Sequence, residues 1–403
     1  MPEVEGNATI GGVTFYAEKA GQNTVIVQLD NVVEAINDPD SYVVQVTKNL
    51  CDLMGSLDDD PDEYYSATAG SIDGVVAKWG GNTKLKSGNF IANSNVEKIE
   101  GTLTEVIVPV MMTSQSSDGK YTEISFLMSA QTIHRIRMFD DRTEIVLYNV
   151  GMFPETLTIE ENPLFSSASY QKNGSTITVT LTHKKSMHIF GYKPEFKNGL
   201  LVISFKNPIS LKEGSQPLAG IKISIDPGHS LNGGAVGPWG TTKWTEADWN
   251  YEIALLVNEK LQALGATTYM THNREQIFDL DPIIEMYRAW EPDMNISIHY
   301  NYVPDDTNPA TAKGSEAYYS YSSSKLLAKT VLDTFCKETG FYNRGHKGGY
   351  YKVSRFVDFP SILFETAFIS NIEEYEWFTY DENKEKAAQA IVDGIVEYYR
   401  LQS

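Results

Sequence analysis

The sequence predicts an α/β domain in the C-terminal part of the chain, with a mostly parallel twisted sheet and helices on both of its faces, preceded by an all-β or β-rich N-terminal region. Up to about residue 208, apolar and polar residues alternate in short runs separated by turn residues. After about residue 218, short apolar strands alternate with helical stretches. The length of 403 residues exceeds the ~100 to 200 residues of a typical domain, so we expect two or three folded units.

Three turn dipeptides predict hairpins in the β-rich region, namely Asp118–Gly119, Asn173–Gly174 and Asn198–Gly199. Asn or Asp followed by Gly supplies the positive φ angles that two-residue hairpin turns need. We therefore expect antiparallel strands around each dipeptide.

These patterns divide the chain into four parts. Residues 1–129 are expected to be a β-rich region whose role the sequence does not indicate, and residues 130–208 a β-sandwich-like module. Residues 209–217 are expected to be a linker, because the stretch from 207 to 220 reads NPISLKEGSQPLAG and has no sustained periodicity. Residues 218–403 form the expected α/β domain.

The α/β domain is expected to contain short strands that alternate with helices. Apolar residues recur on one face of its first and last helices, at the spacing of an amphipathic helix. Strands and helices are expected, in order, at Ile221–Ile225, Ala247–Leu264, Thr267–Met270, Pro282–Trp290, Met294–Ile298, Glu316–Tyr321, Lys325–Glu338, Tyr350–Val353, Ile362–Phe364 and Lys384–Tyr399.

The composition disfavours several classes of protein. The formal net charge of -20 argues against nucleic acid as a partner and against binding of anionic polymers by charge alone, because like charges repel. No apolar run approaches the ~18 residues of a membrane span. The start, MPEVEG, lacks the basic and apolar segments of a signal peptide, so none is present in the chain as given. Cys51 and Cys336 fall in different expected domains, so we expect no disulfide.

Polar side chains follow the expected strands of the α/β domain where ligands usually bind. His229 comes after the strand Ile221–Ile225, and His299 and Glu365 directly follow two later strands. Glu246 lies just ahead of the first helix. In open α/β sheets, functional residues gather at the carboxyl ends of the strands, so we expect these four side chains to lie near one another.

Two histidines and one carboxylate are a ligand set for catalytic zinc, whose fourth position takes water. Zinc lowers the pKa of that water, and a separate carboxylate is then needed to move its proton. Glu365 is the candidate for this role, because an acid directly after Ser-Ile-Leu-Phe is expected to be partly buried. On spacing alone, hydrogen-bonded structural histidines and a solvated Glu246 stay open as alternatives.

Five segments of the α/β domain occur in an order and spacing typical of one enzyme family. They are IDPGHSLNGGAVG, TEADWN, NISIHYN, NRGHKGGYYKVSR and FPSILFETAFISN. Over about 180 residues, this half of the chain resembles the zinc-dependent N-acetylmuramoyl-L-alanine amidases, which are cell-wall hydrolases with an α/β fold. One departure is Ala367, which stands where the family usually has Gly.

The resemblance implies roles for particular residues. The family's zinc ligands fall on His229, Glu246 and His299, and its catalytic glutamate falls on Glu365. Asn301 and Arg355 are weaker candidates for holding substrate, with a structural role as the alternative.

The implied function is hydrolysis of the amide bond between N-acetylmuramic acid and L-alanine in peptidoglycan, outside the cell or in its wall. A zinc peptidase or deacetylase acting on another amide, and an inactive wall-binding protein, remain alternatives. Residues 130–208 resemble the β-sandwich modules found ahead of such amidases, which implies a role in wall targeting. Regulated family members carry a blocking helix after the fourth strand, and the short Ser320–Ser324 connection predicts none here.

Overall fold

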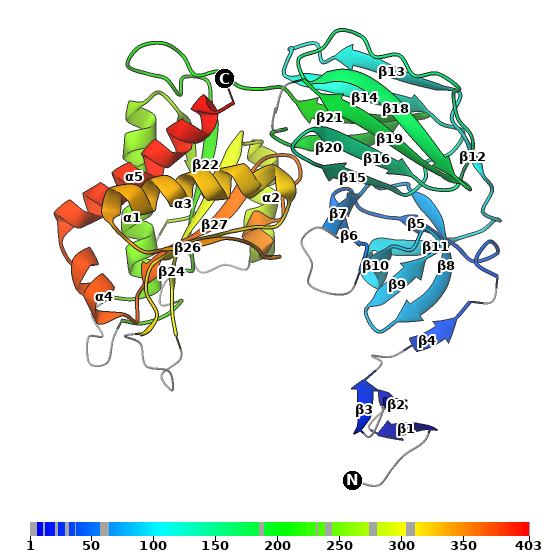
Figure 1. Ribbon diagram of the computed structural model, residues 1–403, viewed down its shortest axis with the longest axis horizontal. Coiled ribbons are helices and arrows are strands. Elements are labelled where there is room, and N and C mark those ends of the chain that lie inside the picture. The colour runs from blue at the N-terminus through cyan, green and yellow to red at the C-terminus, as the bar shows by residue number, and fades with distance from the viewer. Residues whose placement is uncertain are drawn as a thin grey trace.

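The chain folds into β-rich units followed by an α/β domain (Figure 1). The computed structural model describes residues 6–10, 13–20, 23–28, 32–36, 38–56, 64–184, 189–230, 233–237, 244–273, 280–303 and 311–402. Before Asn207, the regular elements of these ranges are strands, apart from one short 3-10 helix. None of the helices in the described ranges is both long and apolar enough to cross a membrane.

Two antiparallel sheets make up the start of the chain. The first has the order β1-β2-β3, and the second the order β11-β5-β8-β9-β10-β6-β7 with β4 beside β8. Val44, Leu53, Val75 and Ile91 are buried in the core of the second sheet. The elements are β1 (Gly6–Ile10), β2 (Val13–Ala20), β3 (Asn23–Gln28), β4 (Val32–Ala35), β5 (Val43–Val46), β6 (Cys51–Met54), β7 (Tyr64–Ala67), β8 (Ile72–Trp79), β9 (Asn82–Leu85), β10 (Phe90–Ala92), η2 (Asn93–Asn95) and β11 (Val96–Ile99).

The next unit is a sandwich of two four-stranded sheets, ordered β13-β14-β21-β20 and β15-β16-β19-β18. Their inner faces share a core in which Phe126, Leu147, Val179 and Ile203 are fully buried. The strands are β12 (Val106–Ile107), β13 (Val110–Gln115), β14 (Tyr121–Leu127), β15 (His134–Met138), β16 (Arg142–Leu147), β17 (Val150–Met152), β18 (Phe165–Asn173), β19 (Thr176–His183), β20 (Tyr192–Lys197) and β21 (Leu200–Lys206).

All three expected hairpins are confirmed. Gly119, Gly174 and Gly199 have positive φ angles and stand between antiparallel strands. Asn198 also has a positive φ, of 55°, so the last hairpin has positive φ at both turn residues, as a type I′ turn requires.

The sandwich begins before residue 130, where the sequence predicted a boundary. β14 pairs along its whole length with β21, so one sheet joins residues on both sides of that boundary. The module therefore starts near β12 and includes the first predicted hairpin. Alternation along a strand shows which face is buried but not which distant strand lies beside it, and this is why the sequence misplaced the boundary.

The C-terminal domain is built on one six-stranded mixed sheet of order β23-β22-β24-β27-β25-β26. Its first four strands are parallel, and β25 runs antiparallel to β27 with β26 parallel to β25. Most pairs are thus parallel, as expected. The strands are β22 (Lys222–Pro227), β23 (Thr267–Met270), β24 (Met294–Asn301), β25 (Ser315–Tyr319), β26 (Asn343–Gly348) and β27 (Ser361–Phe368).

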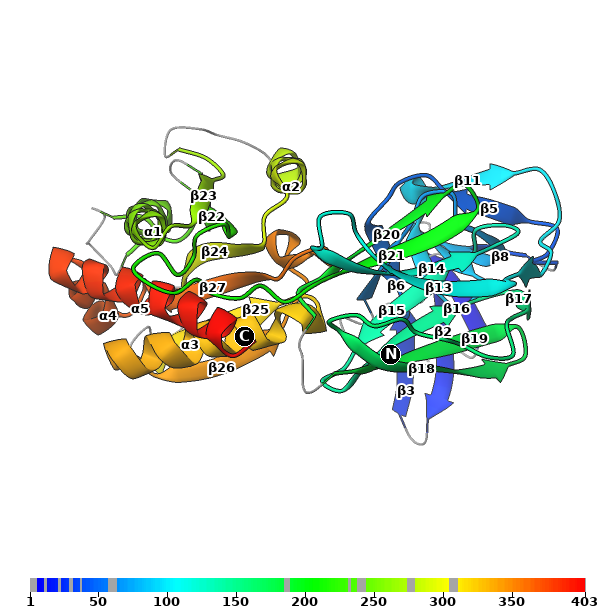
Figure 2. The same cartoon turned by 90° about the horizontal axis from the view of Figure 1, so that it is seen from above.

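Helices cover both faces of this sheet (Figure 2). α1, α3 and α5 lie on one face and share its core with Ile225, Ile298 and Phe364, whereas α2 lies on the other face. Because successive strand residues point to opposite faces, His299 and Glu365 point away from the three packed helices. The helices are α1 (Glu246–Ala263), α2 (Leu280–Trp290), η4 (Ser322–Ser324), α3 (Lys325–Thr339), η5 (Lys352–Ser354), α4 (Ile372–Phe378) and α5 (Asp381–Arg400).

The expected elements of the α/β domain are present, with one error. Residues 350–353 are not a strand, since η5 begins at Lys352, and the edge strand of this region is β26. The sequence of β26, NRGHKG, contains two glycines and no β-branched residue, so propensity gave no signal for it. Between β25 and α3, the described residues form only the three-residue 3-10 helix η4.

The sandwich and the α/β domain share a buried junction. Lys206 of β21 forms an ion pair of 2.5 Å with Asp293, and both side chains are largely buried. The Tyr192 N–H donates to the Val357 carbonyl at 2.7 Å. The Phe190 ring stacks on Tyr399 at 5.9 Å between centroids. An ion pair, a backbone hydrogen bond and an aromatic contact thus join the two units, which are packed against each other rather than loosely tethered.

Candidate functional site

Parallel strands bring the candidate residues to one edge of the sheet. His229 follows β22, and His299 and Glu365 lie opposite each other in the register of β24 and β27. Glu246 is the first residue of α1. The four residues predicted from the sequence therefore occupy the same end of the domain, at the carboxyl ends of the parallel strands.

Three of these residues form a cluster that can hold a metal ion. One ligand atom from each of His229, Glu246 and His299 lies within 4.8 Å of the other two. Glu246 Oε1 is 3.1 Å from His229 Nε2 and 3.1 Å from His299 Nδ1. Ligands held ~2.0 to 2.1 Å from a tetrahedral ion are about 3.3 Å apart, so these separations fit a single ion among them.

Glu246 is fixed by backbone donors on both of its oxygens. The Ala235 N–H donates to Oε2 at 2.9 Å, and the Tyr300 N–H donates to Oε1 at 3.2 Å. Burial alone would raise the pKa of Glu246, but the hydrogen bonds from His229 and His299 outweigh it and hold the pKa well below its ordinary value. The carboxylate is therefore ionised, which is the form that binds a cation.

Thr245 and Asp248 determine where α1 starts and so where Glu246 stands. The Thr245 hydroxyl accepts from the Asp248 N–H, and the Asp248 carboxylate accepts from the Thr245 N–H, which is a capping box. Because Glu246 is the first residue after this cap, its side chain leaves the helix at the strand ends.

Two glycines make room for the histidines. A Cβ on Gly228 would lie 2.3 Å from the His299 ring, and one on Gly234, which has φ +78°, would lie 2.7 Å from the His229 ring. The Asn250 side chain, which is fully buried, donates to the Gly228 carbonyl at 2.8 Å. His229 itself adopts a φ of 63°, a rare conformation for a residue with a side chain. The loop is shaped closely around the two rings, although its residues 231–232 lie outside the described ranges.

Glu365 has the environment of a proton carrier. Its Oε2 is enclosed and has no hydrogen-bond partner among the described residues. Burial and the charges of Glu246 and Glu316 raise the pKa of Glu365 to about 8, against the opposing effect of His299. A carboxyl group that titrates near neutral pH can both accept and donate a proton there.

Glu316 was not selected from the sequence, and it lies directly opposite Glu365 on β25. It is 2% exposed and accepts from Asn301 at 2.6 Å and from Arg344 at 3.0 Å, and it also pairs with Lys347. No local pattern marks it, because β25 reads SEAYY and the cationic partners of Glu316 lie on a different strand, β26. Asn301 therefore contacts Glu316 and lies beside the site, as one of the two weaker candidates.

Arg355, the other weak candidate, points elsewhere. Its Nε donates to the Tyr350 carbonyl at 2.8 Å, its guanidinium lies 3.8 Å from the centre of the Tyr350 ring, and Asp52 of β6 is 3.5 Å away. The Asp52 contact links the α/β domain to the second β-rich sheet, which favours the structural alternative for Arg355.

Residues 223–397 match the family model of N-acetylmuramoyl-L-alanine amidases. The chain is 33% identical over 211 residues to the N-acetylmuramoyl-L-alanine amidase LytC of Bacillus subtilis (strain 168), a match that covers 50% of this chain and 41% of LytC. It is 30% identical over 219 residues to the germination-specific N-acetylmuramoyl-L-alanine amidase of the same organism, covering 50% of this chain and 89% of that protein.

Among solved structures, the catalytic domain of the amidase CwlV from Bacillus (Paenibacillus) polymyxa var. colistinus is 28% identical to the aligned part of this chain. The alignment covers 44% of this chain and 97% of that domain, with a TM-score of 0.41. The matched region thus spans less than half of LytC but most of the germination-specific enzyme. On the strength of the family match and that relative, the chain belongs to the N-acetylmuramoyl-L-alanine amidase family.

Proposed function

We propose that the chain is a zinc-dependent peptidoglycan hydrolase that cleaves the amide bond between N-acetylmuramic acid and L-alanine. The observation that carries this proposal is that three potential metal ligands, His229, Glu246 and His299, lie beside a separate carboxylate. That carboxylate, Glu365, is enclosed and stands opposite His299 on the adjacent strand. Membership of the amidase family indicates which bond is cleaved. Because this substrate lies in the wall, the site of action is outside the cell.

The donor set supports zinc as the metal. Two imidazole nitrogens and one carboxylate oxygen, with a fourth position left for water, are characteristic of catalytic zinc sites. When bound, zinc supplies an acidified water and polarises a carbonyl group. His229, Glu246 and His299 would hold the ion, and the backbone donors on Glu246 would keep that carboxylate in place.

Glu365 moves the protons in this mechanism. In its ionised form it takes a proton from the attacking water, and it then gives that proton to the departing nitrogen of L-alanine. The raised pKa suits the second step, and the nearby cation would favour the ionised form that the first step needs. The opposite carboxylate, Glu316, is already paired with Arg344 and Lys347, so it cannot serve as a second base.

Replacement of Glu365 tests the proposal. We expect Glu365→Gln to lower the release of peptides from purified peptidoglycan by about 10²- to 10⁴-fold, the usual contribution of a general acid-base, with zinc content unchanged. Glu195→Gln, on an exposed position of β20, is the matched control and should retain the wild-type rate. Wild-type activity of Glu365→Gln would exclude this role.

Mass spectrometry of the products identifies the bond. A free amino terminus on L-alanine supports the amidase. A cut within the stem peptide would assign the site to a peptidase, and loss of acetate would assign it to a deacetylase. A chelator should abolish product formation, and added zinc should restore it.

A further inference from the structure

The face of the sheet that carries Glu365 continues onto β25 with a tyrosine. Glu365 stands between His299 of β24 and Glu316 of β25 in the strand register, so these three side chains point to the same face. Tyr318 follows Glu316 by two residues and points to this face as well, about 7 Å further along the strand. The Tyr318 hydroxyl donates to Glu316 Oε1 at 2.7 Å. The Tyr318 ring is therefore held beside the two carboxylates.

Tyr351 adds a second ring to this surface. The Tyr318 and Tyr351 rings meet edge to face, with 5.0 Å between their centroids and 65° between their planes. Tyr351 fits there because residue 349 is a glycine, whose added Cβ would lie 2.8 Å from the Tyr351 ring and 3.1 Å from the Tyr318 ring. Tyr318 is half-buried, whereas Tyr351 is 44% exposed. We call these two residues the tyrosine pair.

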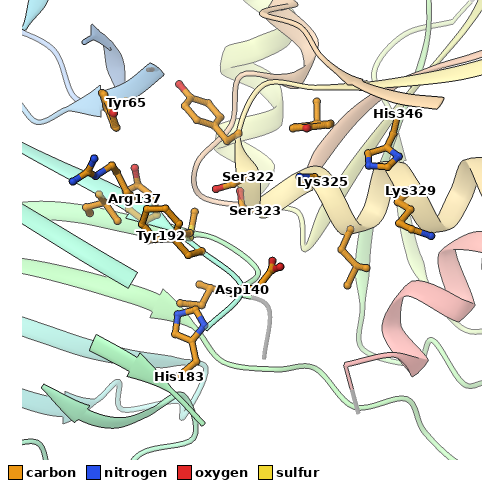
Figure 3. A pocket seen from close by; sticks show the side chains of 17 residues that line it. Tyr65, Arg137, Asp140, His183, Tyr192, Ser322, Ser323, Lys325, Lys329 and His346 are labelled. Carbon is orange, nitrogen blue, oxygen red and sulfur yellow. The ribbon is translucent and has the colours of Figure 1, made fainter. Parts of the chain in front are cut away.

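The tyrosine pair does not belong to the cleft between the sandwich and the α/β domain. That cleft has a volume of about 600 Å³, with Tyr192 on one wall and Ser322 on the other (Figure 3). Tyr319 lines it, and successive strand residues such as Tyr318 and Tyr319 point to opposite faces of a sheet. The cleft therefore lies on the other face, away from Glu365.

The surface that the tyrosine pair presents is uncharged. Lys347 Nζ lies 5.8 Å from the centre of the Tyr318 ring, but Lys347 and Arg344 both form ion pairs with Glu316. An exposed tyrosine ring among charges that are already engaged suits a neutral group with an apolar face. A sugar ring is such a group, since its C–H bonds form apolar faces and its hydroxyl groups lie at the edge.

The substrate of the proposed function brings a sugar to this place. Its scissile carbonyl is joined to N-acetylmuramic acid on one side and to the peptide on the other, so a bond that reaches Glu365 leaves the sugar close by. We propose that the tyrosine pair binds the N-acetylmuramic acid ring, with Tyr351 packed on the face of the sugar. This assignment rests on the proposed function, because the hydrolysed bond determines which groups lie beside Glu365.

Two substrates that share a peptide and differ in the sugar test the assignment. One is a muropeptide of N-acetylglucosamine, N-acetylmuramic acid and the stem peptide, and the other is the same peptide carried on lactate alone. With the zinc-loaded full chain, we expect Tyr351→Ala to raise the KM for the muropeptide about tenfold with kcat unchanged, because the ring contributes binding alone. The KM for the lactoyl peptide should stay within about twofold of the wild-type value.

Three further variants identify the cause. Tyr351→Phe keeps the ring and should hold the muropeptide KM within about twofold of wild type. Gly349→Ala keeps both tyrosines but displaces the Tyr351 ring, so it should raise the muropeptide KM as Tyr351→Ala does. Phe139→Ala is the matched control, since it removes a ring of 38% exposure that lines the cleft on the other face, and it should leave both KM values unchanged.

Two results with Tyr351→Ala would overturn the proposal. An equal rise in KM for the two substrates would assign the ring to the peptide instead of the sugar. An equal rise in the muropeptide KM for Phe139→Ala would mean that the effect is not specific to the tyrosine pair.

Failure of the proposed function gives a different result, namely that the wild type hydrolyses neither substrate. Isothermal titration calorimetry then decides on the tyrosine pair. Binding of the muropeptide about tenfold tighter than that of the lactoyl peptide, with the difference lost in Tyr351→Ala, would support the sugar position. Equal binding of the two by the wild type would overturn it.

Discussion

Glu316 and Glu365 face each other on adjacent strands, yet their surroundings give them opposite properties. For Glu316, burial is outweighed by hydrogen bonds from Lys347, Tyr318 and Arg344, which lower its pKa. Glu365 has burial and two carboxylates acting on it, with only His299 opposing them, so its pKa is raised. Two carboxylates whose pKa values are pushed apart can have different tasks. Glu316 is ion-paired with Arg344 and Lys347, and the raised pKa of Glu365 agrees with the proton transfer proposed for it.

Gly228 offers a test of how tightly the loop packs against the potential metal ligand His299. We expect Gly228→Ala to weaken zinc binding by about 10- to 100-fold, as for loss of a residue that orients a ligand, because the added methyl group would lie 2.3 Å from the His299 ring and displace it. Gly81→Ala is the matched control, since a Cβ there meets no atom within 4 Å. Competition with a chelating dye measures the affinity, and equal zinc binding by wild type and Gly228→Ala would contradict the prediction.

At the scale of elements, α3 and α5 lie in close contact because α5 has a glycine where they meet. A Cβ on Gly394 would lie 2.8 Å from the Val331 Cα, an atom of the α3 backbone that cannot move without the helix. The two helices also bury Leu327, Phe335 and Ile391 against the sheet that carries the site.

Gly394→Ala separates helix propensity from packing. In a solvated helix interior this change stabilises by roughly 1 kcal/mol. Here we expect it to destabilise the domain by about 1 to 3 kcal/mol, the usual cost of overpacking. Thermal unfolding measures the difference, with Lys386→Ala on the exposed face of α5 as the control expected within about 0.5 kcal/mol of wild type. Stabilisation by Gly394→Ala would show that α3 moves freely.

The sequence predicted the elements that carry a local pattern and missed those that do not. The helices α1, α3 and α5 were found because burial of one face imposes a period on their residues. The strands β22, β24 and β27 are buried on both faces and were found as short apolar runs. β26 was missed because an edge strand need not be apolar, and Glu316 because its partners, Arg344 and Lys347, come from that same strand. Its role depends on a pairing that no local pattern records.

At the scale of the whole molecule, the junction decides whether the sandwich and the α/β domain unfold together. Lys206 and Asp293 are 6% and 15% exposed, and the Lys222 N–H also donates to Asp293 at 2.8 Å. Buried ion pairs lose several kcal/mol when one partner is removed, because the remaining charge is left without compensation.

Lys206→Met should therefore uncouple the two units. We expect a loss of about 3 to 5 kcal/mol in the free energy of unfolding, with a single calorimetric transition giving way to two. Lys86→Met is the control, because the Lys86–Asp40 pair is nearly half exposed and exposed pairs contribute less than about 1 kcal/mol. An unchanged melting profile for Lys206→Met would mean that the junction does not couple the units.

Phe190 links the core of the α/β domain to a segment that is synthesised before that domain. Its ring belongs to the core of the α/β domain, where it packs against Tyr398 and Tyr399 near the end of the last helix, although it precedes β22 in the chain. Units closer to the N-terminus leave the ribosome first and fold first. The sandwich can thus fold with Phe190 in place before α5 is synthesised, and the last turns of α5 complete a core that includes a residue some two hundred positions earlier.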